Sequence, residues 1–516
     1  MRITNKIMQR NNLSNINTNK IYQDTLSTQM STQKKINRPS DDPVVAIRAL
    51  RLRSSVTEIT QYYSKNIPDA ESWLSVTEDS LKNLTAIVTN MISQATKGSN
   101  GDLTSSDRQI ILEQLKALRD EVYATGDADY AGRYVFTGYR TDTSLSFPTA
   151  EDKLYTITEQ VDNSAISKLT KIDTGDLLDI NASNYQNMNV TEQDISSVDV
   201  YRIRLAYDNC YAEGTAPSIK YWEDDGTGTS TYVQKEYSIA EGNLTIMHSY
   251  QDPYTEIAKA GNEDKIIYVP ETGEMLMGAD AYNKLMQTKD DPATLSNEGE
   301  IQVTYQKEEW AVGDLRPEHY FYCESDGIKY NESFLTGNAE RQDIEYDVGF
   351  NQTIRVNSTA DQCFQHGIGR EVDDLIESMQ NVLDIEAVIA KIEKEMETAT
   401  GTNADTLQTQ LDAANKALTL AKDKTQKLFE QGITTLQGHL DNANLCITEC
   451  GTRGSKLTLI KNRMQSQKTT FETLKSENED VDITEVAIQL TSAELTYEAA
   501  LMATGKVMQT TLLNFI

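Results

Sequence analysis

The sequence predicts a mainly α-helical protein with an inserted β-rich domain: a long antiparallel helical bundle plus terminal coiled-coil helices. Three observations lead to this fold class. Apolar residues recur at alternating steps of three and four toward both ends of the 516-residue chain, which is the spacing of a helix seam. In the middle of the chain the spacing changes to two, as in strands. The middle also holds 17 of the 25 tyrosines, a residue enriched in strands.

The amino-acid composition limits the kinds of partner that this protein is expected to bind. The chain has 79 acidic and 48 basic residues and a net charge of -31, which argues against nucleic acid as a partner. No stretch approaches the ~20 consecutive apolar residues that span a bilayer, so we expect no membrane segment. The first 20 residues contain six asparagines and no apolar run, so we expect no cleaved signal peptide.

Residues 1–40 form a polar and basic assembly segment. Through Arg38 the segment carries seven basic residues and one acidic residue, Asp24. Its apolar residues, among them Ile3 and Ile7, are too sparse to offset the entropy lost when the segment becomes ordered. Two interpretations stay open for the ends of the chain. They are either two solvated tails or a coiled coil that forms on assembly, with the N-terminal segment paired to the C-terminus.

Residues 41–150 form the first half of the helical bundle. Either Ser40 or Asp41 is expected to cap its first helix, because Pro43 is suited to the first helical turn. Pro68 should kink or interrupt this helix, because proline lacks an amide hydrogen and its ring clashes with the preceding turn. A stop at residues 97–101 and a further helix complete this half.

Residues 151–343 form the inserted β-rich outer domain. Apolar residues alternate there, for example at Ile301, Val303 and Tyr305. Hairpin turns are expected at residues 225–226, 271–273 and 326–327, which contain the glycines that such turns require. Because inserted domains usually have close ends, removing residues 151–341 should leave a soluble bundle.

Residues 344–482 form the second half of the bundle, and residues 483–516 form a C-terminal assembly helix. The seam of that last helix is light, because alanine and threonine occupy positions where a stable zipper would have leucine. Such a helix needs a partner. The predicted assembly interface comprises Val486, Leu490, Ala493, Tyr497, Ala500, Leu501, Val507, Met508, Leu512 and Phe515, together with Ile3 and Ile7.

No catalytic or metal-binding constellation is recognisable, so we expect no enzyme and no cofactor. The four histidines lie far apart in the sequence, and neither a phosphate-binding nor a dinucleotide-binding glycine pattern occurs. Cys446 and Cys450 are four residues apart on a predicted helix and would supply half a metal site, but no second pair accompanies them. The tyrosines of the insertion favour cross-strand packing over a sugar- or protein-binding face.

Several motifs resemble one known family. Residues 36–43 (INRPSDDP) are similar to the N-terminal signature of the flagellin superfamily, and residues 494–501 and 512–516 are similar to its C-terminal signature. Within that superfamily, residues 132–143 (GRYVFTGYRTDT) and 479–485 resemble the hook-associated junction proteins. The resemblance covers residues 1–147 and 344–516.

This resemblance implies a structural subunit of the bacterial flagellum that joins the hook to the flagellin filament by packing. The implied partners are further copies of the chain in a ring, the other hook-associated junction protein, flagellin and a flagellar export chaperone. The implied location is extracellular, reached through the flagellar type III apparatus without a cleaved signal peptide. Two other functions stay open: a filament flagellin, and a flagellum-borne surface adhesin or glycan-binding module that acts through the insertion.

Overall fold

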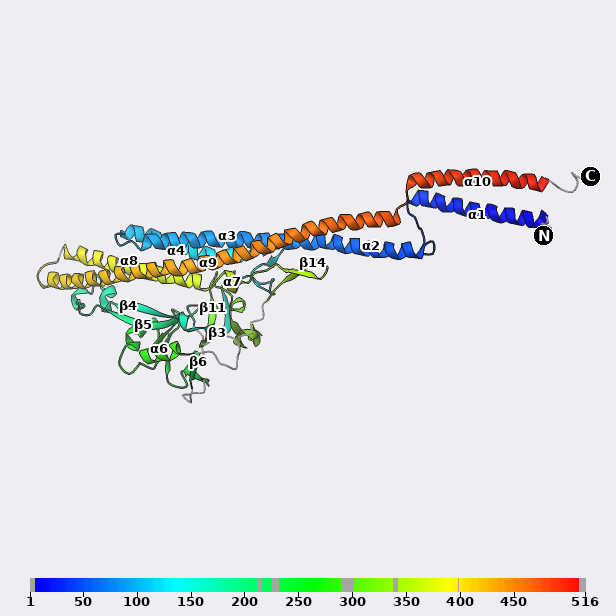
Figure 1. The fold of residues 1–516 in the computed structure, drawn as a ribbon. Helices are drawn as coiled ribbons and strands as arrows, with labels where there is room; N and C mark the ends of the chain where they lie inside the picture. The colour runs from blue at the N-terminus through cyan, green and yellow to red at the C-terminus, as the bar shows by residue number, and fades with distance from the viewer. Residues whose placement is uncertain are drawn as a thin grey trace, which may run out of the picture. The chain divides into compact units, whose positions relative to one another are not determined.

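The computed structural model describes residues 5–210, 216–224, 232–288, 301–336, 342–397 and 399–509. It confirms the expected fold class: long helices at both ends of the chain and a β-rich insertion between them (Figure 1). The chain divides into two compact units. One comprises residues 1–71, 346–354 and 455–516, and the other comprises residues 72–345 and 355–454. No described helix combines the length and the hydropathy that a bilayer crossing requires.

The first unit is built from long helices and one hairpin. The helices of the N-terminal part are α1 (Asn5–Thr32), α2 (Pro43–Gln61), the π-helical η1 (Tyr62–Asn66) and the start of α3 (Ile67–Gly98). The C-terminal part contributes the end of α9 (Thr402–Glu479) and α10 (Ile483–Gln509). The hairpin consists of β14 (Glu345–Gly349) and β15 (Gln352–Arg355).

Local sequence explains where α2 begins and where the regular α-helix is interrupted before α3. The residue that caps α2 is Asp42, which accepts the amide hydrogens of Val44 and Val45 at 2.9 and 3.1 Å. The expectation of Ser40 or Asp41 was therefore wrong by one position, because a cap directly precedes the proline that opens the helix. The interruption near Pro68 is confirmed: η1 lies directly before α3, whose second residue is Pro68.

The second unit combines four helix segments with the insertion. Its helices are the remainder of α3, α4 (Ser105–Gly126), α8 (Gly367–Met396) and the first part of α9, with the short α5 (Pro253–Ile257), α6 (Ala279–Met286) and α7 (Ala360–Cys363). The side chain of Thr104 and that of Asp107 form a reciprocal capping box at the start of α4. α8 and α9 are separated at Gly401, whose φ of +66° favours glycine.

The strands of the insertion form two sheets. The six-stranded sheet has the order β13-β12-β3-β11-β6-β7, and the five-stranded sheet has the order β4-β5-β10-β9-β8. All pairs are antiparallel except β8 with β9. The strands are β3 (Glu151–Val161), β4 (Ile166–Asp173), β5 (Ser196–Arg204), β6 (Ser218–Asp224), β7 (Tyr232–Ser238), β8 (Leu244–Ile246), β9 (Ile266–Val269), β10 (Glu274–Met277), β11 (Ile301–Trp310), β12 (Tyr322–Ser325) and β13 (Ile328–Tyr330). A two-residue pair, β1 (Asp129–Tyr130) and β2 (Arg133–Tyr134), precedes them.

Two of the three expected hairpin turns are confirmed. Asp326 and Gly327 join β12 to β13 with φ values of +53° and +74°, the left-handed region that a tight hairpin turn needs. Gly273 precedes β10 with a φ of +63°, and a Cβ there would lie 1.9 Å from the carbonyl oxygen of Tyr207. The turn expected at residues 225–226 lies outside the described residues.

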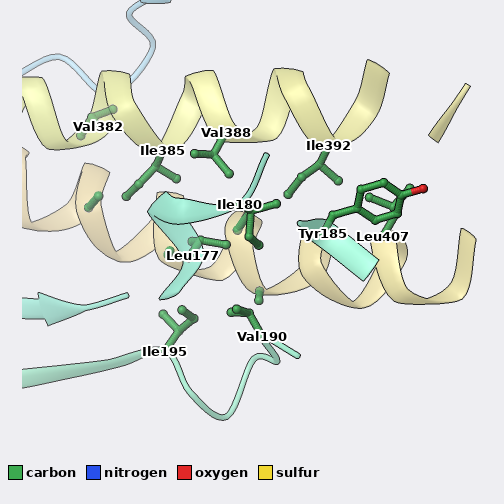
Figure 2. Packing of buried hydrophobic residues seen from close by; sticks show 14 residues of the cluster. Leu177, Ile180, Tyr185, Val190, Ile195, Val382, Ile385, Val388, Ile392 and Leu407 are labelled. Carbon is green, nitrogen blue, oxygen red and sulfur yellow. The ribbon is translucent and has the colours of Figure 1, made fainter. Parts of the chain in front are cut away.

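The insertion shares a hydrophobic core with α8 and α9. The segment that leads from β4 to β5 contains the short 3₁₀ turns η3 (Gly175–Asp179) and η4 (Tyr185–Asn187), and its apolar side chains meet those of the two helices (Figure 2). The buried cluster includes Leu177, Ile180, Tyr185, Val190 and Ile195 from this segment and Val382, Ile385, Val388, Ile392 and Leu407 from the helices. The insertion is therefore not a separable domain attached at a surface loop.

Candidate interface of the paired terminal helices

The two terminal helices pack against each other through a small apolar seam. Leu26 of α1 and Val486 and Ala493 of α10 are buried together, with Val481 and Leu490 partly buried beside them. Figure 1 shows α1 and α10 side by side. The two ends are thus a helix pair, and the interpretation as two solvated tails is not what the structure shows. Leu26 is the residue that the predicted interface missed, although it continues the series that contains Ile7.

The predicted interface residues fall into three groups. Val486 and Ala493 are buried, and Leu490, Tyr497 and Ala500 are half-buried. Ile7 and Leu501 remain 50% and 46% exposed. The side chains of the third group are not described. Val507 and Met508 belong to α10 without a description of their side chains, and Ile3, Leu512 and Phe515 lie outside the described residues.

Polar contacts fix the register of the pair at its inner end. The amide of Val481 donates to the carbonyl of Gln33 at 3.2 Å, and the amide of Lys35 donates to the carbonyl of Glu479 at 2.8 Å. Lys34 forms an ion pair with Asp480, which raises the pKa of Lys34. The chain entering α10 and the chain leaving α1 therefore form a short antiparallel bridge.

Glu479 is the charged centre of this junction. Its side chain is only 3% exposed, and its two carboxylate oxygens accept hydrogen bonds from Nε and Nη2 of Arg53 at 2.6 and 2.7 Å. Lys34 Nζ lies 3.6 Å from the same carboxylate. The bond from Arg53, followed by the charges of Arg53 and Lys34, lowers the pKa of Glu479. One carboxylate thus connects α2, α9 and the segment after α1.

The outer faces of the helices in this unit carry many exposed large apolar side chains. A soluble monomer rarely exposes large apolar patches, so such faces mark surfaces that pack against something else. These side chains are Ile7, Met8, Leu13, Ile21, Tyr22 and Met30 on α1, Val44, Ile47 and Leu50 on α2, and Ile483, Ile488, Leu495, Leu501 and Met502 on α10. The seam between α1 and α10 leaves these side chains uncovered, so the helix pair is suited to further packing.

Elsewhere, the titratable groups form no recognisable catalytic arrangement within the described residues. His319 and His366 are partly buried, and their loss of contact with water lowers the pKa of each to about 4. His439 Nδ1 donates a hydrogen bond to Gln365 Oε1, and His248 pairs with Glu271. No group of three or more histidine, cysteine or carboxylate side chains in the described part of the chain is placed to hold a metal ion.

The tyrosines of the insertion mainly fill its core. Several pack ring against ring, as Tyr221 does with Tyr237 and Tyr155 with Trp310. The buried tyrosines are Tyr155, Tyr185, Tyr207, Tyr221, Tyr237, Tyr254, Tyr268, Tyr305 and Tyr320. This agrees with the expectation of internal packing rather than a tyrosine-lined binding face.

Comparison with known proteins finds similarity to flagellar proteins over part of the chain. The bacterial flagellin N-terminal helical region matches residues 3–141. Flagellar hook-associated protein 3 of Salmonella typhimurium is 30% identical over 169 residues, which cover 32% of this chain and 53% of that protein. The chain resembles flagellar hook-associated protein 3. The protein of the same name from Escherichia coli is 30% identical over 154 residues, or 30% of this chain and 47% of the relative.

The similarity to these relatives covers only part of each protein. The chain spans about half the length of the two hook-associated relatives that it matches. A flagellin of Clostridium tyrobutyricum is 28% identical over 122 residues, which cover 24% of this chain and 32% of that flagellin. The matches to hook-associated protein 3 are therefore longer than the match to this flagellin.

Two solved structures align with most of this chain, but the structural agreement is weak. A putative flagellar hook-associated protein from Vibrio parahaemolyticus aligns with 85% of this chain and 100% of its own, at 13% identity and a TM-score of 0.35. FlgL of Xanthomonas campestris aligns with 82% of this chain and 99% of its own, at 11% identity and a TM-score of 0.25. TM-scores of this size do not establish a shared arrangement in space.

Proposed function

We propose that this chain is a structural subunit of the bacterial flagellum that connects the hook to the flagellin filament. The observation that carries the proposal is the pair of terminal helices, which is held together by a small seam and leaves large apolar side chains on its outer faces. The flagellin-like region at residues 3–141 and the two relatives named hook-associated protein 3 support the same assignment. The protein acts by packing and is not an enzyme.

The proposed mechanism is assembly by burial of those outer faces between copies in a ring. Each large apolar side chain that becomes fully buried contributes about 1.5–3 kcal/mol. A single seam of alanine, valine and leucine gives the isolated pair little stability, so most of the stabilisation arises when neighbouring subunits bind. Residues 1–40 and 483–516 are the proposed assembly segments. Residues 41–150 and 344–482 form the bundle, and residues 151–343 form the outer insertion.

The remaining partners follow from this role. The other hook-associated junction protein would bind on the hook side and flagellin on the filament side. Before assembly, the apolar faces of α10 require cover, which a flagellar export chaperone would provide. The subunit would reach the outside of the cell unfolded, through the flagellar type III apparatus and without a cleaved signal peptide.

The decisive experiment removes the gene from the source bacterium. Cells without the protein should build hooks, lack filaments and release flagellin into the medium, because flagellin has no surface on which to assemble. Electron microscopy of the cells and an assay of secreted flagellin measure both outcomes, with the full-length gene supplied in trans as control. Normal filaments in the deletion strain would exclude the junction role.

A filament flagellin is the second candidate, and the match to the Clostridium tyrobutyricum flagellin favours it. Copy number separates the two functions. A filament protein dominates sheared flagella, whereas a junction protein is a trace component. Quantitative mass spectrometry of sheared flagella therefore distinguishes them without any mutation.

A further inference from the structure

Three buried cysteines lie near one another where the chain returns to the helical bundle. Cys363 ends α7, and Cys446 and Cys450 lie one turn apart on α9; all three are free thiols. Their spacing on α9 suggested half a metal site, but their contacts differ. Cys450 Sγ contacts the carbonyl oxygen of Leu74 at 3.4 Å, whereas Cys446 Sγ contacts that of Gln362 at 3.5 Å.

The segment that contains Cys363 is attached to α9 by residues on both sides of Cys446. Asn442 Nδ2, one turn before Cys446, donates to the carbonyl of Gln362 at 2.7 Å. Arg453 Nη1, further along α9, donates to the carbonyl of Asn357 at 2.8 Å. These contacts attach the segment that contains Cys363 to α9 at two points. Both thiols are buried, with Cys363 1% and Cys446 8% exposed, and Cys446 Sγ contacts the carbonyl oxygen of the residue directly before Cys363.

The surroundings give the two thiols of α9 different reactivity. The neighbouring Cys363 thiol lowers the pKa of Cys446, so Cys446 is the sulfur of α9 that ionises more readily. Burial raises the pKa of Cys450 to about 11, which leaves it protonated at neutral pH. Because the thiolate is the attacking species in thiol–disulfide exchange, Cys446 is the expected nucleophile and Cys450 is not.

We propose that Cys363 and Cys446 form an intramolecular disulfide in an oxidising environment. The Cys446 thiolate attacks one sulfur of a small-molecule disulfide such as oxidised glutathione, and one glutathione thiolate leaves. The Cys363 thiol loses its proton to solvent and attacks the Cys446 sulfur of the mixed disulfide, which releases the second glutathione. Two electrons pass from the two cysteines to oxidised glutathione, which becomes two molecules of reduced glutathione.

The bond would close a loop that contains the whole of α8. In the cytosol, where reduced glutathione predominates, the thiols stay reduced and the chain remains free to unfold. Outside the cell the bond would hold the segment between β15 and α8 on α9. This timing rests on the proposed flagellar function, whereas the pairing of the two thiols does not. Because both sulfurs are buried, oxidation should be fastest while the chain is folding.

The test uses the purified full-length chain, denatured and then refolded in glutathione buffers from fully reduced to fully oxidised. The expected product is a single disulfide between Cys363 and Cys446, found by alkylation of the remaining thiols and peptide mapping. Cys450→Ala, the matched control on the same helix, should give the same bond. Cys446→Ala and Cys363→Ala should each give none. Circular dichroism of each variant refolded in the fully reduced buffer establishes that it folds.

A second readout is thermal stability. Oxidised wild type and oxidised Cys450→Ala should each melt several degrees above their reduced forms, because the bond restricts the unfolded chain. Cys446→Ala should melt at the same temperature in both buffers. Complete alkylation of Cys363 and Cys446 after refolding in the oxidised buffer would overturn the proposal, as would a bond between Cys446 and Cys450. If the purified chain forms the bond but sheared flagella contain the chain with free thiols, the proposed timing of oxidation is wrong. If sheared flagella contain no copies of the chain, the proposed location is wrong. The pairing of the two thiols stands in both cases.

Discussion

The buried carboxylate of Glu479 determines how the first unit holds its N-terminal segment. Arg53 and Lys34 both approach it, and its own carbonyl accepts the amide of Lys35. Because the pKa of Glu479 is lowered, its ionised form stabilises the fold. That contribution is present above the ordinary pKa of 4.5 and is lost as the pH falls below it.

We therefore expect Glu479→Gln to loosen the junction between α1 and α9. The loss of a charge-assisted bond to Arg53 should cost about 1–3 kcal/mol. Hydrogen exchange followed by mass spectrometry should show faster exchange at residues 33–36. Glu477→Gln is the matched control, since Glu477 is exposed two residues away and only its carbonyl contacts Lys35. Equal exchange in the two variants would show that the Glu479 carboxylate holds nothing in place.

A second buried carboxylate, Glu159 on β3, should make the insertion sensitive to pH. Burial raises the pKa of Glu159 to about 7, although Tyr305 and the amide of Ala206 donate hydrogen bonds to it. The native state therefore binds the proton more tightly than the unfolded chain. The free energy of unfolding should fall by about 3 kcal/mol as the pH rises from 4.5 to 7 and stay low above that.

Glu159→Gln should remove this dependence, because an amide keeps an acceptor oxygen and cannot ionise. Denaturant unfolding at pH 5 and pH 8 measures the free energy of unfolding at each pH. The fluorescence of Trp310, which lies in the adjacent strand, reports the transition. Glu308→Gln, on the same strand as Tyr305 but exposed, should retain the wild-type pH dependence. If the free energy of unfolding of Glu159→Gln changed with pH as much as that of the wild type, another group would be responsible for the pH dependence.

Single residues were the hardest feature to predict from the sequence. The proline at position 43 located the start of α2 to within one residue, since proline at the first turn is a local signal. Glu159 and Glu479 gave no such signal. Each is buried by residues that lie far away in the chain, so nothing in the local sequence distinguishes either one from the many exposed carboxylates.

At the scale of elements, the terminal helices were predictable because their apolar spacing is local. The buried positions Val486 and Ala493 follow from that spacing. The partner residue Leu26 did not follow, because the register between two weak helices depends on the bridge formed by residues 33–35 and 479–481. Helix spacing identifies a face but not the point on another helix that meets it.

Two sets of substitutions on α10 should separate pairing from assembly. Leu490→Asp with Tyr497→Asp places carboxylates in the half-buried seam. It should abolish assembly and also speed exchange in α1, with almost no change in melting temperature. Leu495→Asp with Met502→Asp changes residues that are 70% and 68% exposed, so it should block assembly and leave exchange in α1 unchanged.

Sedimentation of the assembled protein and hydrogen exchange on the dilute monomer measure the two effects. A large fall in melting temperature for the seam variant would show that the pair is part of the monomer's core. Normal assembly of the outer-face variant would show that these exposed side chains contact no neighbour.

The isolated monomer itself should hold its terminal helices weakly. Two helices that meet through a light seam gain little from pairing, since helix nucleation is costly and few apolar groups are buried. Amides in α1 and α10 should exchange much faster in dilute solution than those in α8. Strong protection of either terminal helix would mean that the pair is stable before assembly.

At the scale of the whole molecule, composition and spacing predicted the order helical, β-rich, helical. They did not predict that the insertion contributes to the core of the helical part. Residues 174–195 carry no regular period, so the sequence offered no reason to place them on α8 and α9. Two polar side chains of α9 strengthen this attachment: Gln410 donates to the carbonyls of Tyr185 and Met188, and Lys416 donates to that of Ile195.

This shared core changes the expected result of removing the insertion. Excising residues 151–341 would uncover Val382, Ile385 and Val388 on α8 and Leu407 on α9, which the segment after β4 now covers. Exposing each of these side chains costs about 1.5–3 kcal/mol of stability, so the shortened chain should bind hydrophobic dyes and aggregate. Light scattering and dye fluorescence measure this, with the full-length chain at equal concentration as control. Replacing Val382, Ile385 and Val388 with glutamine in the excised chain should restore solubility by removing the uncovered apolar side chains. A soluble, dye-free excised chain without these replacements would show that α8 and α9 can cover the surface themselves.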